Sequence, residues 1–217
     1  MKTCYIFCAA GFDGLLAPIP EDALTIAADG GLRHTQALGL CPDVILGDFD
    51  SLGYVPEGSQ VFPVEKDDTD SMLAVRLGLE KGCREFFLYG GMDGPRLDHT
   101  IANFQTLAFL AANGARGYLV GKDYIATVAA RETLIFPESF DGIFSCFCLG
   151  SDLTGLTIRG MKYNLTNGTL SAAFPLGVSN HFIGQEASLT LENGLLLALW
   201  DRKNGLCRRD GLEESLC

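Results

Sequence analysis

The chain has 217 residues, enough for one large domain or two modest ones. Its hydrophobic fraction of 47% is ordinary for a globular protein with a core. The formal net charge of −11 argues against nucleic acid as the main partner, because a phosphate backbone requires a basic surface.

The first apolar run, residues 2–10, is too short for a secretory signal and is followed by Gly11 and Asp13, so it predicts a buried strand. No stretch approaches the apolar length of a membrane span, and we expect no membrane partner. The eight cysteines lie mostly in apolar runs and form no CxxC pair, which is typical of reduced thiols used as small hydrophobes. We therefore expect a cytoplasmic protein without disulfides or a zinc site.

Strands alternate with helices through the first half of the sequence. We predict strands at residues 24–28, 44–46, 60–64, 85–89 and 116–120, and helices at 32–38, 66–81 and 98–113. This alternation predicts βαβ units and a largely parallel sheet. Each strand is followed by Gly and Asp, and in open α/β sheets ligands bind outside those carboxyl ends.

Helical periodicity disappears after about residue 130. Short runs rich in Phe, Leu, Ile and Thr predict strands at residues 143–149, 153–158, 170–174, 187–191 and 195–200. Asn167-Gly168 and Asn193-Gly194 predict hairpin turns, and the polar tail after Asp201 is expected to be frayed. The sequence thus predicts an α/β domain at 1–130 and a small all-β domain, a sandwich or an open barrel, at 131–217.

The turn Gly47-Asp48-Phe49-Asp50-Ser51 follows the strand at 44–46. In extended backbone, residues two apart point to the same side, so Asp48 and Asp50 are expected to face one spot with Phe49 turned away. Two carboxylates there repel each other unless a cation lies between them, and magnesium prefers one or two carboxylates plus substrate phosphates. The alternative is a polar turn at a strand end.

Asp29-Gly30-Gly31 lies at a strand-to-helix junction, in a chain without a Walker A or GxGxxG motif. Glycines there let the backbone approach a ligand closely, and the following helix presents N–H groups to an anion. A tight turn that requires positive φ explains the glycines equally well.

Three acids, Asp67, Asp68 and Asp70, open the helix predicted at 66–81. One acid suffices to cap a helix and complement its dipole. Three acids near a second acidic pair exceed that need, so we expect at least one to be catalytic or metal-binding, with Asp70 as first choice.

A further group of polar residues follows the strand at 85–89 and comprises Gly90, Gly91, Arg96, Asp98, His99 and Asn103. His99 and Asn103 are four residues apart and share a helix face. Arg96 is suited to contact phosphate, and Asp98 to bind substrate or metal. The alternative is a local Arg–Asp ion pair plus a helix cap.

Two segments of the β domain are candidates for ligand binding, the one around Tyr163 and the one around Ser179 and Asn180. The Tyr163 ring offers a face for stacking a flat ligand. Turn chemistry around strands is the alternative for each segment.

Together these motifs resemble the bacterial type of the thiamine pyrophosphokinase family. The matching segments span nearly the whole chain in the family's order. They are Ala28-Asp29-Gly30-Gly31, Pro42-Asp43, Gly47-Asp48-Phe49-Asp50-Ser51, Lys66-Asp67-Asp68-Thr69-Asp70, Gly90-Gly91, Arg96-Leu97-Asp98-His99 with Asn103, Gly160-Met161-Lys162-Tyr163-Asn164-Leu165, and Val178-Ser179-Asn180.

The resemblance implies an α/β domain followed by a β-sandwich, and a homodimer with its active site between the subunits. It implies transfer of pyrophosphate from ATP to thiamine with Mg²⁺, giving thiamine diphosphate and AMP. Residues 1–130 are then the nucleotide- and metal-binding catalytic domain, and residues 131–217 bind thiamine.

Residue by residue, the resemblance implies that Asp48, Asp50 and Asp70 handle the metal and that Asp98 lies in the active site beside the substrate. Asp70 and Asp98 are both candidates for accepting the proton, and the sequence does not choose between them. Thiamine contacts are expected from Tyr163, Ser179 and Asn180. Nucleotide contacts are expected from Asp29, Gly30, Gly31, Gly90, Gly91, Arg96, His99 and Asn103.

The sequence departs from the family pattern in three places. Met161 replaces a common Leu, and Tyr163 stands where animal relatives use Trp, as is usual in bacterial members. The loop Met92-Asp93-Gly94-Pro95 is less glycine-rich than usual. Two other functions fit an Asp-x-Asp pattern or a binding fold, namely a metal-dependent glycosyl- or nucleotidyltransferase and a non-catalytic thiamine or nucleotide sensor.

Overall fold

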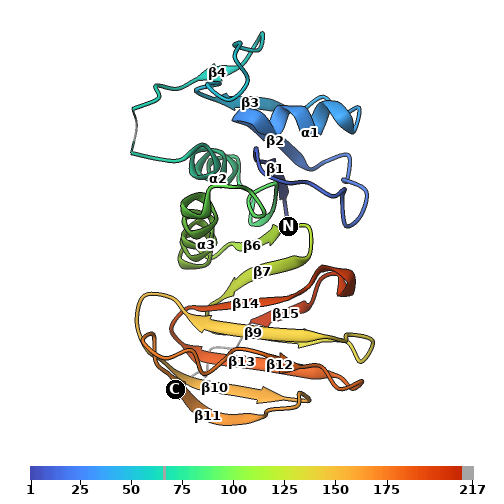
Figure 1. Ribbon diagram of the computed structural model, residues 1–217, viewed down its shortest axis with the longest axis vertical. Coiled ribbons are helices and arrows are strands. Elements are labelled where there is room, and N and C mark those ends of the chain that lie inside the picture. The colour runs from blue at the N-terminus through green and yellow to red at the C-terminus, as the bar shows by residue number, and fades with distance from the viewer. Residues whose placement is uncertain (66, 212–217) are drawn as a thin grey trace. The chain divides into compact units, whose positions relative to one another are not determined.

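The computed structural model describes residues 1–65 and 67–211 (Figure 1). The chain forms two compact units, Met1–Lys122 and Asp123–Cys217. Lys66 of the acidic motif and residues 212–217 of the tail lie outside the described residues.

The first unit is built on a parallel sheet with the strand order β6-β5-β1-β2-β3-β4. Its strands are β1 (Thr3–Phe7), β2 (Leu24–Ala28), β3 (Val44–Gly47), β4 (Gln60–Val61), β5 (Glu85–Tyr89) and β6 (Arg116–Val120). The predicted parallel sheet is therefore confirmed. The short β4 shows that the strand expected at 60–64 ends after two residues.

Three helices pack on this sheet: α1 (Leu32–Ala37), α2 (Asp70–Glu80) and α3 (Leu97–Ala112), with a short 3-10 turn, η1 (Asp29–Gly31), before α1. α2 and α3 lie side by side (Figure 1). α3 packs closely on β6, where a Cβ on Gly117 would come within 2.6 Å of Leu110 and 2.8 Å of Leu107. α1 is followed by Gly39 with φ +68°, as expected for a glycine after a helix C-terminus.

The second unit contains two antiparallel sheets. One has the order β12-β9-β14-β7, and the other the order β11-β10-β13-β8-β15. The strands are β7 (Tyr124–Ala129), β8 (Glu132–Phe136), β9 (Ile143–Cys148), β10 (Leu153–Arg159), β11 (Leu165–Leu170), β12 (Asn180–His181), β13 (Ala187–Asn193), β14 (Leu196–Asp201) and β15 (Arg208–Gly211), with a 3-10 turn η2 (Arg202–Asn204).

Aromatic side chains fill the space between these two sheets. The Phe136 ring on β8 lies 5.4 Å from Phe144 on β9 and 5.6 Å from Trp200 on β14, centroid to centroid. Phe140 and Phe182 complete the cluster. Rings from both sheets meeting in one core define a sandwich, so the predicted fold class is confirmed.

The domain boundary expected at residue 130 differs from the division of the compact units. That division lies between Lys122 and Asp123, because β7 pairs with β14 and so belongs to the second unit. β7, Tyr124–Ala129, was not predicted as a strand.

Both hairpin-turn predictions were wrong. Asn167 and Gly168 lie inside β11, where Asn167 has φ +47° and the pairing with β10 shifts register, as at a β-bulge. Residues 171–174, expected to be strand, are not. Asn193-Gly194 connects β13 of one sheet to β14 of the other, so the strands it joins do not pair with each other.

The tail was expected to be frayed after Asp201, which was also wrong as far as Gly211. β15 pairs with β8, and Arg209 on it is 7% exposed. The cysteines within the described residues carry free thiols. In the described part of the chain, no helix is long and apolar enough to cross a membrane.

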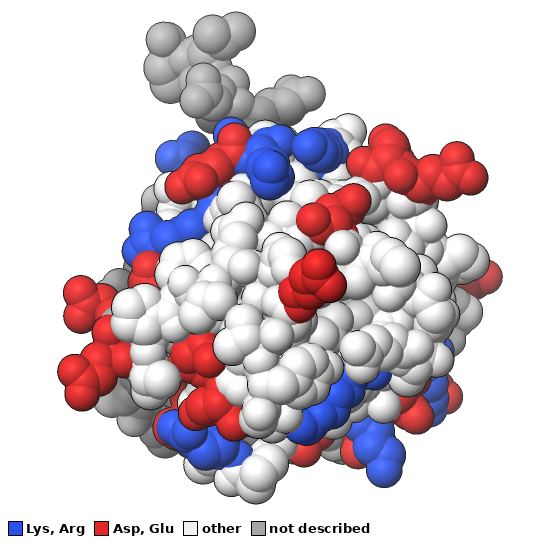
Figure 2. Space-filling model, turned by 90° about the horizontal axis from the view of Figure 1, so that it is seen from above, with Lys and Arg blue, Asp and Glu red and all other residues white. Residues whose placement is uncertain are grey.

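Charged side chains of both signs are present on the face shown in Figure 2. On the face shown in Figure 2, Asp and Glu lie among uncharged side chains and Lys and Arg lie mainly near the margin. The described residues of that face form no continuous basic surface of the kind that a nucleic-acid backbone requires.

Candidate active site

The register of the parallel sheet brings four chain segments to one edge. Phe7 of β1 pairs with Ala27 and Tyr89, and Ala28 pairs with Leu46, so β1, β2, β3 and β5 end at nearly the same level. The residues that follow these strands line a cleft of about 530 Å³ at the carboxyl edge of the sheet.

Nine of the predicted site residues line this cleft: Asp29, Asp48, Asp50, Asp70, Gly90, Gly91, Arg96, His99 and Asn103. Gly30, Gly31 and Asp98 lie nearby but are not among the lining residues. Tyr163, Ser179 and Asn180 belong to the second unit.

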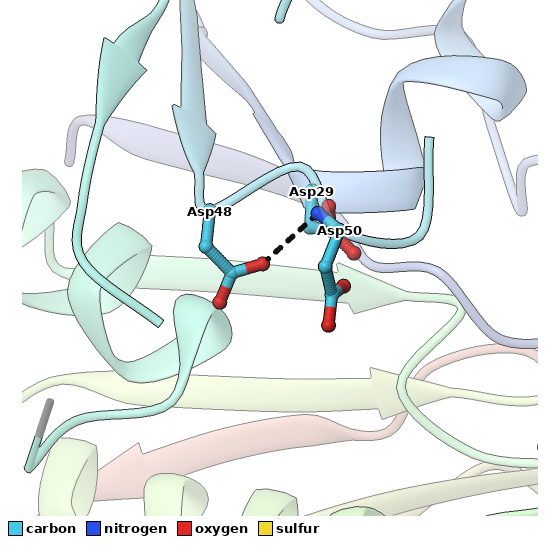
Figure 3. Close-up of side chains that lie close together, drawn as sticks. All are labelled: Asp29, Asp48 and Asp50. Carbon is cyan, nitrogen blue, oxygen red and sulfur yellow. Dashed lines mark hydrogen bonds between the residues drawn. The ribbon is translucent and has the colours of Figure 1, made fainter. Parts of the chain in front are cut away.

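Asp29, Asp48 and Asp50 form an acidic cluster (Figure 3). Each offers a carboxylate oxygen, and these oxygens lie within 4.8 Å of one another. The Asp50 N–H donates to Asp48 Oδ1 at 3.2 Å, which fixes the turn between them. Phe49 has φ +61° and is 2% exposed, so its ring is buried while the flanking carboxylates face the cleft.

Close backbone packing makes this cluster possible. Gly47 has φ +148°, and a Cβ there would come within 3.0 Å of the Asp29 backbone. A Cβ on Gly31 would overlap the Phe7 carbonyl at 1.8 Å. Gly31 has no positive φ (−60°), so the approach of β1, rather than a left-handed turn, explains the glycine at this position.

The donor set of the cluster fits a hard divalent cation. Asp29 is 9% exposed; its Oδ2 accepts a hydrogen bond from Ser51 Oγ at 2.6 Å. Asp29 Oδ1 is buried and has no hydrogen-bond partner among the described residues. A buried carboxylate oxygen requires a compensating partner, and a cation shared with Asp48 and Asp50 provides one.

The composition of this cluster differs from the expected ligand set. From the sequence, Asp29 was expected to contact the nucleotide and Asp70 to bind the metal. In the described residues, Asp29 joins the group within 4.8 Å, and Asp70 lines the same cleft outside that group. One feature of the sequence pointed to Asp29 as a member of the cluster: it directly follows β2, and β2 is the strand next to β3.

The three acids before α2 occupy different positions. Thr69 caps the helix, its Oγ1 accepting from the Met72 N–H at 3.2 Å, so no acid serves as the N-cap. Asp68 forms an ion pair with Arg76 at 3.0 Å. Asp67 is exposed, and Asp70 faces the cleft from the first turn of α2.

Arg96 and Asp98 form an exposed ion pair. Arg96 Nε donates to Asp98 Oδ1 at 3.1 Å, and Nη2 donates to Oδ2 at 2.6 Å. The Arg96 hydrogen bond lowers the pKa of Asp98 to about 2. A carboxylate with so low a pKa is a poor proton acceptor near neutral pH while this pair is intact.

Residues of the loop after Gly91 contact other segments of the first unit. Asp93 has φ +63°, and its Oδ2 accepts from the Lys122 N–H. A Cβ on Gly94 would come within 2.9 Å of the Ala10 Cβ. The loop is therefore held against the segment that follows β1, although it contains fewer glycines than the family pattern.

In the second unit, Asn180 holds the segment that carries Tyr163. Its Oδ1 accepts from the Tyr163 N–H at 2.9 Å, and its Nδ2 donates to the Tyr163 carbonyl at 2.8 Å. Asn180 is 6% exposed, whereas Tyr163 is 59% exposed with Lys162 Nζ 5.3 Å from its ring centroid. Ser179 has φ +60°. The Tyr163 ring is thus accessible, and the Asn180 amide is committed to the protein.

Two family models match the chain. The model "Thiamin pyrophosphokinase, catalytic domain" matches residues 19–119, and the model "Thiamin pyrophosphokinase, vitamin B1 binding domain" matches residues 132–196. The first match contains the acidic cluster and Asp70, and the second contains Tyr163, Ser179 and Asn180.

Individual relatives agree with these matches. Thiamine pyrophosphokinase of Bacillus subtilis (strain 168) is 27% identical over 188 residues, covering 82% of this chain and 87% of the relative. A crystal structure of the Bacillus subtilis enzyme matches with a TM-score of 0.77 and 26% identity, covering 91% of this chain and 98% of the other. An Enterococcus faecalis structure of the same family matches with a TM-score of 0.76 over 93% and 99% of the two chains; at 24% identity this likeness concerns the fold alone.

Proposed function

The chain belongs to the thiamin pyrophosphokinase family, and we infer that it transfers the pyrophosphoryl group of ATP to thiamine, giving thiamine diphosphate and AMP. The observation that carries this conclusion is the match of a catalytic and a vitamin-binding model of one enzyme family to successive parts of the chain. A glycosyl- or nucleotidyltransferase and a non-catalytic sensor are not favoured, because neither accounts for the match to the catalytic model of this family.

The reaction requires the hydroxyethyl oxygen of thiamine to attack the β-phosphorus of ATP. A new O–Pβ bond forms, the bond between Pβ and the α–β bridging oxygen breaks, and AMP leaves with that oxygen. The hydroxyl proton must pass to a base, and the nucleophile must stand in line with the leaving group. The protein's task is therefore to position both substrates and to balance the phosphate charge.

For the metal we propose Mg²⁺, held by Asp48, Asp50 and Asp70, with Asp29 as an additional ligand. The cluster supports the roles of Asp48, Asp50 and Asp29, because its donors are all carboxylate oxygens and one Asp29 oxygen is buried without a hydrogen bond among the described residues. The role of Asp70 is supported by its place in the lining of the same cleft. When bound, Mg²⁺ supplies positive charge against the phosphate oxygens. An acidic protein can then hold a polyanionic substrate.

For the proton we propose Asp70 as the acceptor in preference to Asp98, because Arg96 occupies both oxygens of Asp98 and keeps its pKa low. In this proposal Asp70 accepts the proton on the carboxylate oxygen that does not hold the metal. Arg96 itself lines the cleft and is suited to contact phosphate, together with Gly90, Gly91 and His99. We propose that Gly30 and Gly31 allow the close backbone packing beside Asp29 and do not contact the nucleotide directly.

For thiamine we propose stacking on the exposed ring of Tyr163, within the part matched by the vitamin-binding model. A cation over an aromatic face contributes about 0.5–2 kcal/mol, depending on desolvation. Tyr163→Ala is therefore expected to raise the KM for thiamine by about tenfold. The KM for ATP should stay unchanged, and steady-state kinetics with each substrate varied in turn measures both.

Tyr163→Phe is the matched control, since it keeps the ring and removes only the hydroxyl; it should retain near-normal thiamine affinity. A Tyr163→Ala protein whose ATP affinity falls while its thiamine affinity holds would contradict the assignment of thiamine to the second unit.

We also propose that the enzyme is a homodimer whose subunits share each active site. Large apolar side chains are exposed in the second unit, which supports a protein contact there: Phe174, Leu176, Val178 and Ile183 are 64%, 58%, 43% and 51% exposed. Free thiols and the use of ATP support a place in the cytoplasm.

The shared site predicts complementation between two defective variants. An Asp48→Asn subunit and a Tyr163→Ala/Asn180→Ala subunit, co-expressed in equal amounts, should form one intact site in each mixed dimer. Activity at low thiamine should recover to about a quarter of the wild-type value, because half of the dimers are mixed and each has one of two sites intact. No recovery, with mixed dimers shown by two affinity tags, would place each complete site within one subunit.

The function is tested by incubating the protein with ATP, Mg²⁺ and thiamine, and separately with sugar nucleotides. The proposed function predicts AMP and thiamine diphosphate only in the first mixture. Turnover only with a sugar nucleotide would indicate the transferase alternative, and binding of thiamine without turnover would indicate the sensor.

A further inference from the structure

A directional series of hydrogen bonds joins the start of α2 to the Gly90-Gly91 loop through α3. Thr69 Oγ1 lies 3.0 Å from Ser71 Oγ, which donates to Asn103 Oδ1 at 2.6 Å. Asn103 Nδ2 then donates to the Gly91 carbonyl at 2.8 Å. Ser71 is 7% exposed and Asn103 is 4% exposed, so water competes little for these bonds.

The direction of every bond in this series is determined by its partners. A carbonyl only accepts, so the Asn103 atom facing Gly91 is the amide nitrogen and the oxygen faces Ser71. The Ser71 hydroxyl donates its only proton to Asn103 Oδ1, so in the bond between Thr69 and Ser71 the donor is Thr69. Thr69 in turn accepts from the Met72 N–H as the helix cap. Both polar atoms of the Asn103 side chain are thus bonded to the protein.

One end of the series fixes the Gly90-Gly91 loop. The Gly90 carbonyl accepts from the Ala10 N–H at 2.8 Å, and the Gly91 carbonyl accepts from Asn103. A Cβ on Gly90 would lie 2.4 Å from the Cys8 carbonyl oxygen, so the backbone leaves no space for a side chain at that position. A Cβ on Gly91 would lie 2.5 Å from Leu119 Cδ1 and 3.0 Å from Asn103 Nδ2, so a side chain there would push against Leu119 and Asn103. In a trans peptide the N–H points opposite to the C=O, so these bonds also set the direction of the following N–H groups.

The other end of the series carries Asp70. That residue lies between Thr69 and Ser71, whose hydroxyls both take part, and its carboxylate lines the same cleft as Gly90 and Gly91. The position of Asp70 is therefore coupled to the position of the loop through two buried side chains on different helices.

We propose that Ser71 and Asn103 are positioning residues that hold the Gly90-Gly91 loop in register with Asp70. This rests on the proposed function, in which the loop contacts the phosphates of ATP and Asp70 serves the metal and the proton. Misplacement of a reacting group by about 1 Å can lower a rate by about 10²-fold. Asn103 then acts through the loop, in place of the direct nucleotide contact expected from the sequence.

Ser71→Ala breaks the link and removes from the cleft lining only the Ser71 hydroxyl, leaving the charged groups of the cleft in place. We expect kcat/KM for ATP to fall by about 10–100-fold, as for other supporting side chains, with the KM for thiamine unchanged. We also expect faster hydrogen exchange of the amides of residues 90–96. Thr106→Val is the matched control: Thr106 is 1% exposed on α3, but its hydroxyl donates to the Ala102 carbonyl outside the link, so it should change neither readout.

A second variant separates positioning from folding stability. Ser71→Thr keeps a hydroxyl that can donate to Asn103, so it should restore kcat/KM for ATP and the exchange protection of residues 90–96 relative to Ser71→Ala, with the free energy of unfolding measured alongside. A folded Ser71→Thr protein as inactive as Ser71→Ala would overturn the proposal, as would unchanged exchange of residues 90–96 in Ser71→Ala. A wild-type protein without pyrophosphoryl transfer would refute the proposed function instead, and the exchange comparison would still decide whether the link holds the loop.

Discussion

Replacing Asp48 or Asp50 with Asn is expected to lower kcat for thiamine diphosphate formation by about 10²–10³-fold, the scale for losing one preorganised electrostatic contact. Asn keeps the shape of the side chain and removes the charge that the metal requires. Asp50 is exposed and Asp48 is half-buried, so neither change removes core packing. Asp29→Asn should have the same direction of effect, because Asp29 shares the cluster. Activity is measured with saturating ATP over a range of Mg²⁺ concentrations.

Asp67→Asn is the matched control for these variants. Asp67 belongs to the neighbouring acidic run but is exposed and outside the cleft lining, so its removal should change activity by less than about twofold. Binding of Mn²⁺ to the protein alone, followed by electron paramagnetic resonance, should weaken in the Asp48 and Asp50 variants and not in the control. Near-normal turnover of both variants at low Mg²⁺ would contradict the assignment of the metal site.

Arg209→Met is expected to reduce the free energy of unfolding by about 3–5 kcal/mol, because it leaves a carboxylate buried without its partner. The side chains of Arg209 and Glu132 are 2% and 9% exposed. Arg209 Nε donates to Glu132 Oε2 at 2.9 Å, and its other nitrogens donate to Thr127 Oγ1 at 2.7 Å and the Val128 carbonyl at 2.9 Å. These bonds fasten β15 to the sandwich. Urea unfolding followed by Trp200 fluorescence measures the change.

Two companion variants distinguish a buried unpaired charge from a general loss of packing. Arg209→Met/Glu132→Leu removes both charges and should recover most of the stability, since apolar replacement of a buried pair is often neutral or stabilising. Arg208→Met, on the same strand, removes an exposed ion pair with Asp210 and should cost less than about 1 kcal/mol. A double variant as unstable as Arg209→Met alone would show that the buried charge of Glu132 is not the cause.

The parallel half of the fold was predictable because its strands other than β4 are short, mainly apolar runs that are buried over much of their length. The segments 24–28, 85–89 and 116–120 were predicted with the bounds that the structure has, and each is bounded by Gly, Asp or a charged residue. Strands buried on both faces carry their signal within their own sequence.

The C-terminal strands lack such a signal. β15 reads Arg208-Arg209-Asp210-Gly211, a sequence that resembles a polar tail, and it is a strand because β8 supplies pairing and Glu132 compensates the buried Arg209. Asn167 is a residue type that is common in turns, but it lies within β11, where the pairing with β10 shifts register. In both cases tertiary contacts decide the local structure.

The candidate site likewise combines features that the sequence predicts with features that depend on tertiary packing. The neighbouring carboxylates of Asp48 and Asp50 were predicted from a spacing of two residues in extended backbone, but in the structure a left-handed Phe49, with φ +61°, brings them together. The contribution of Asp29 to that cluster depends on β2 lying next to β3, and the Ser71–Asn103 bond depends on α2 packing against α3. Residue types indicated which groups matter, but the partners of Asp29 and Asn103 are set by strand order and helix packing.

The position of bond cleavage in ATP tests the central claim most directly. ATP labelled with ¹⁸O in the α–β bridge, incubated with Mg²⁺, thiamine and the protein, should yield AMP that retains the label, together with an equal amount of unlabelled thiamine diphosphate. Attack of thiamine on the β-phosphorus requires this result, because the bridging oxygen leaves with AMP. Formation of ADP and thiamine monophosphate, or of AMP without thiamine diphosphate, would contradict pyrophosphoryl transfer by this protein.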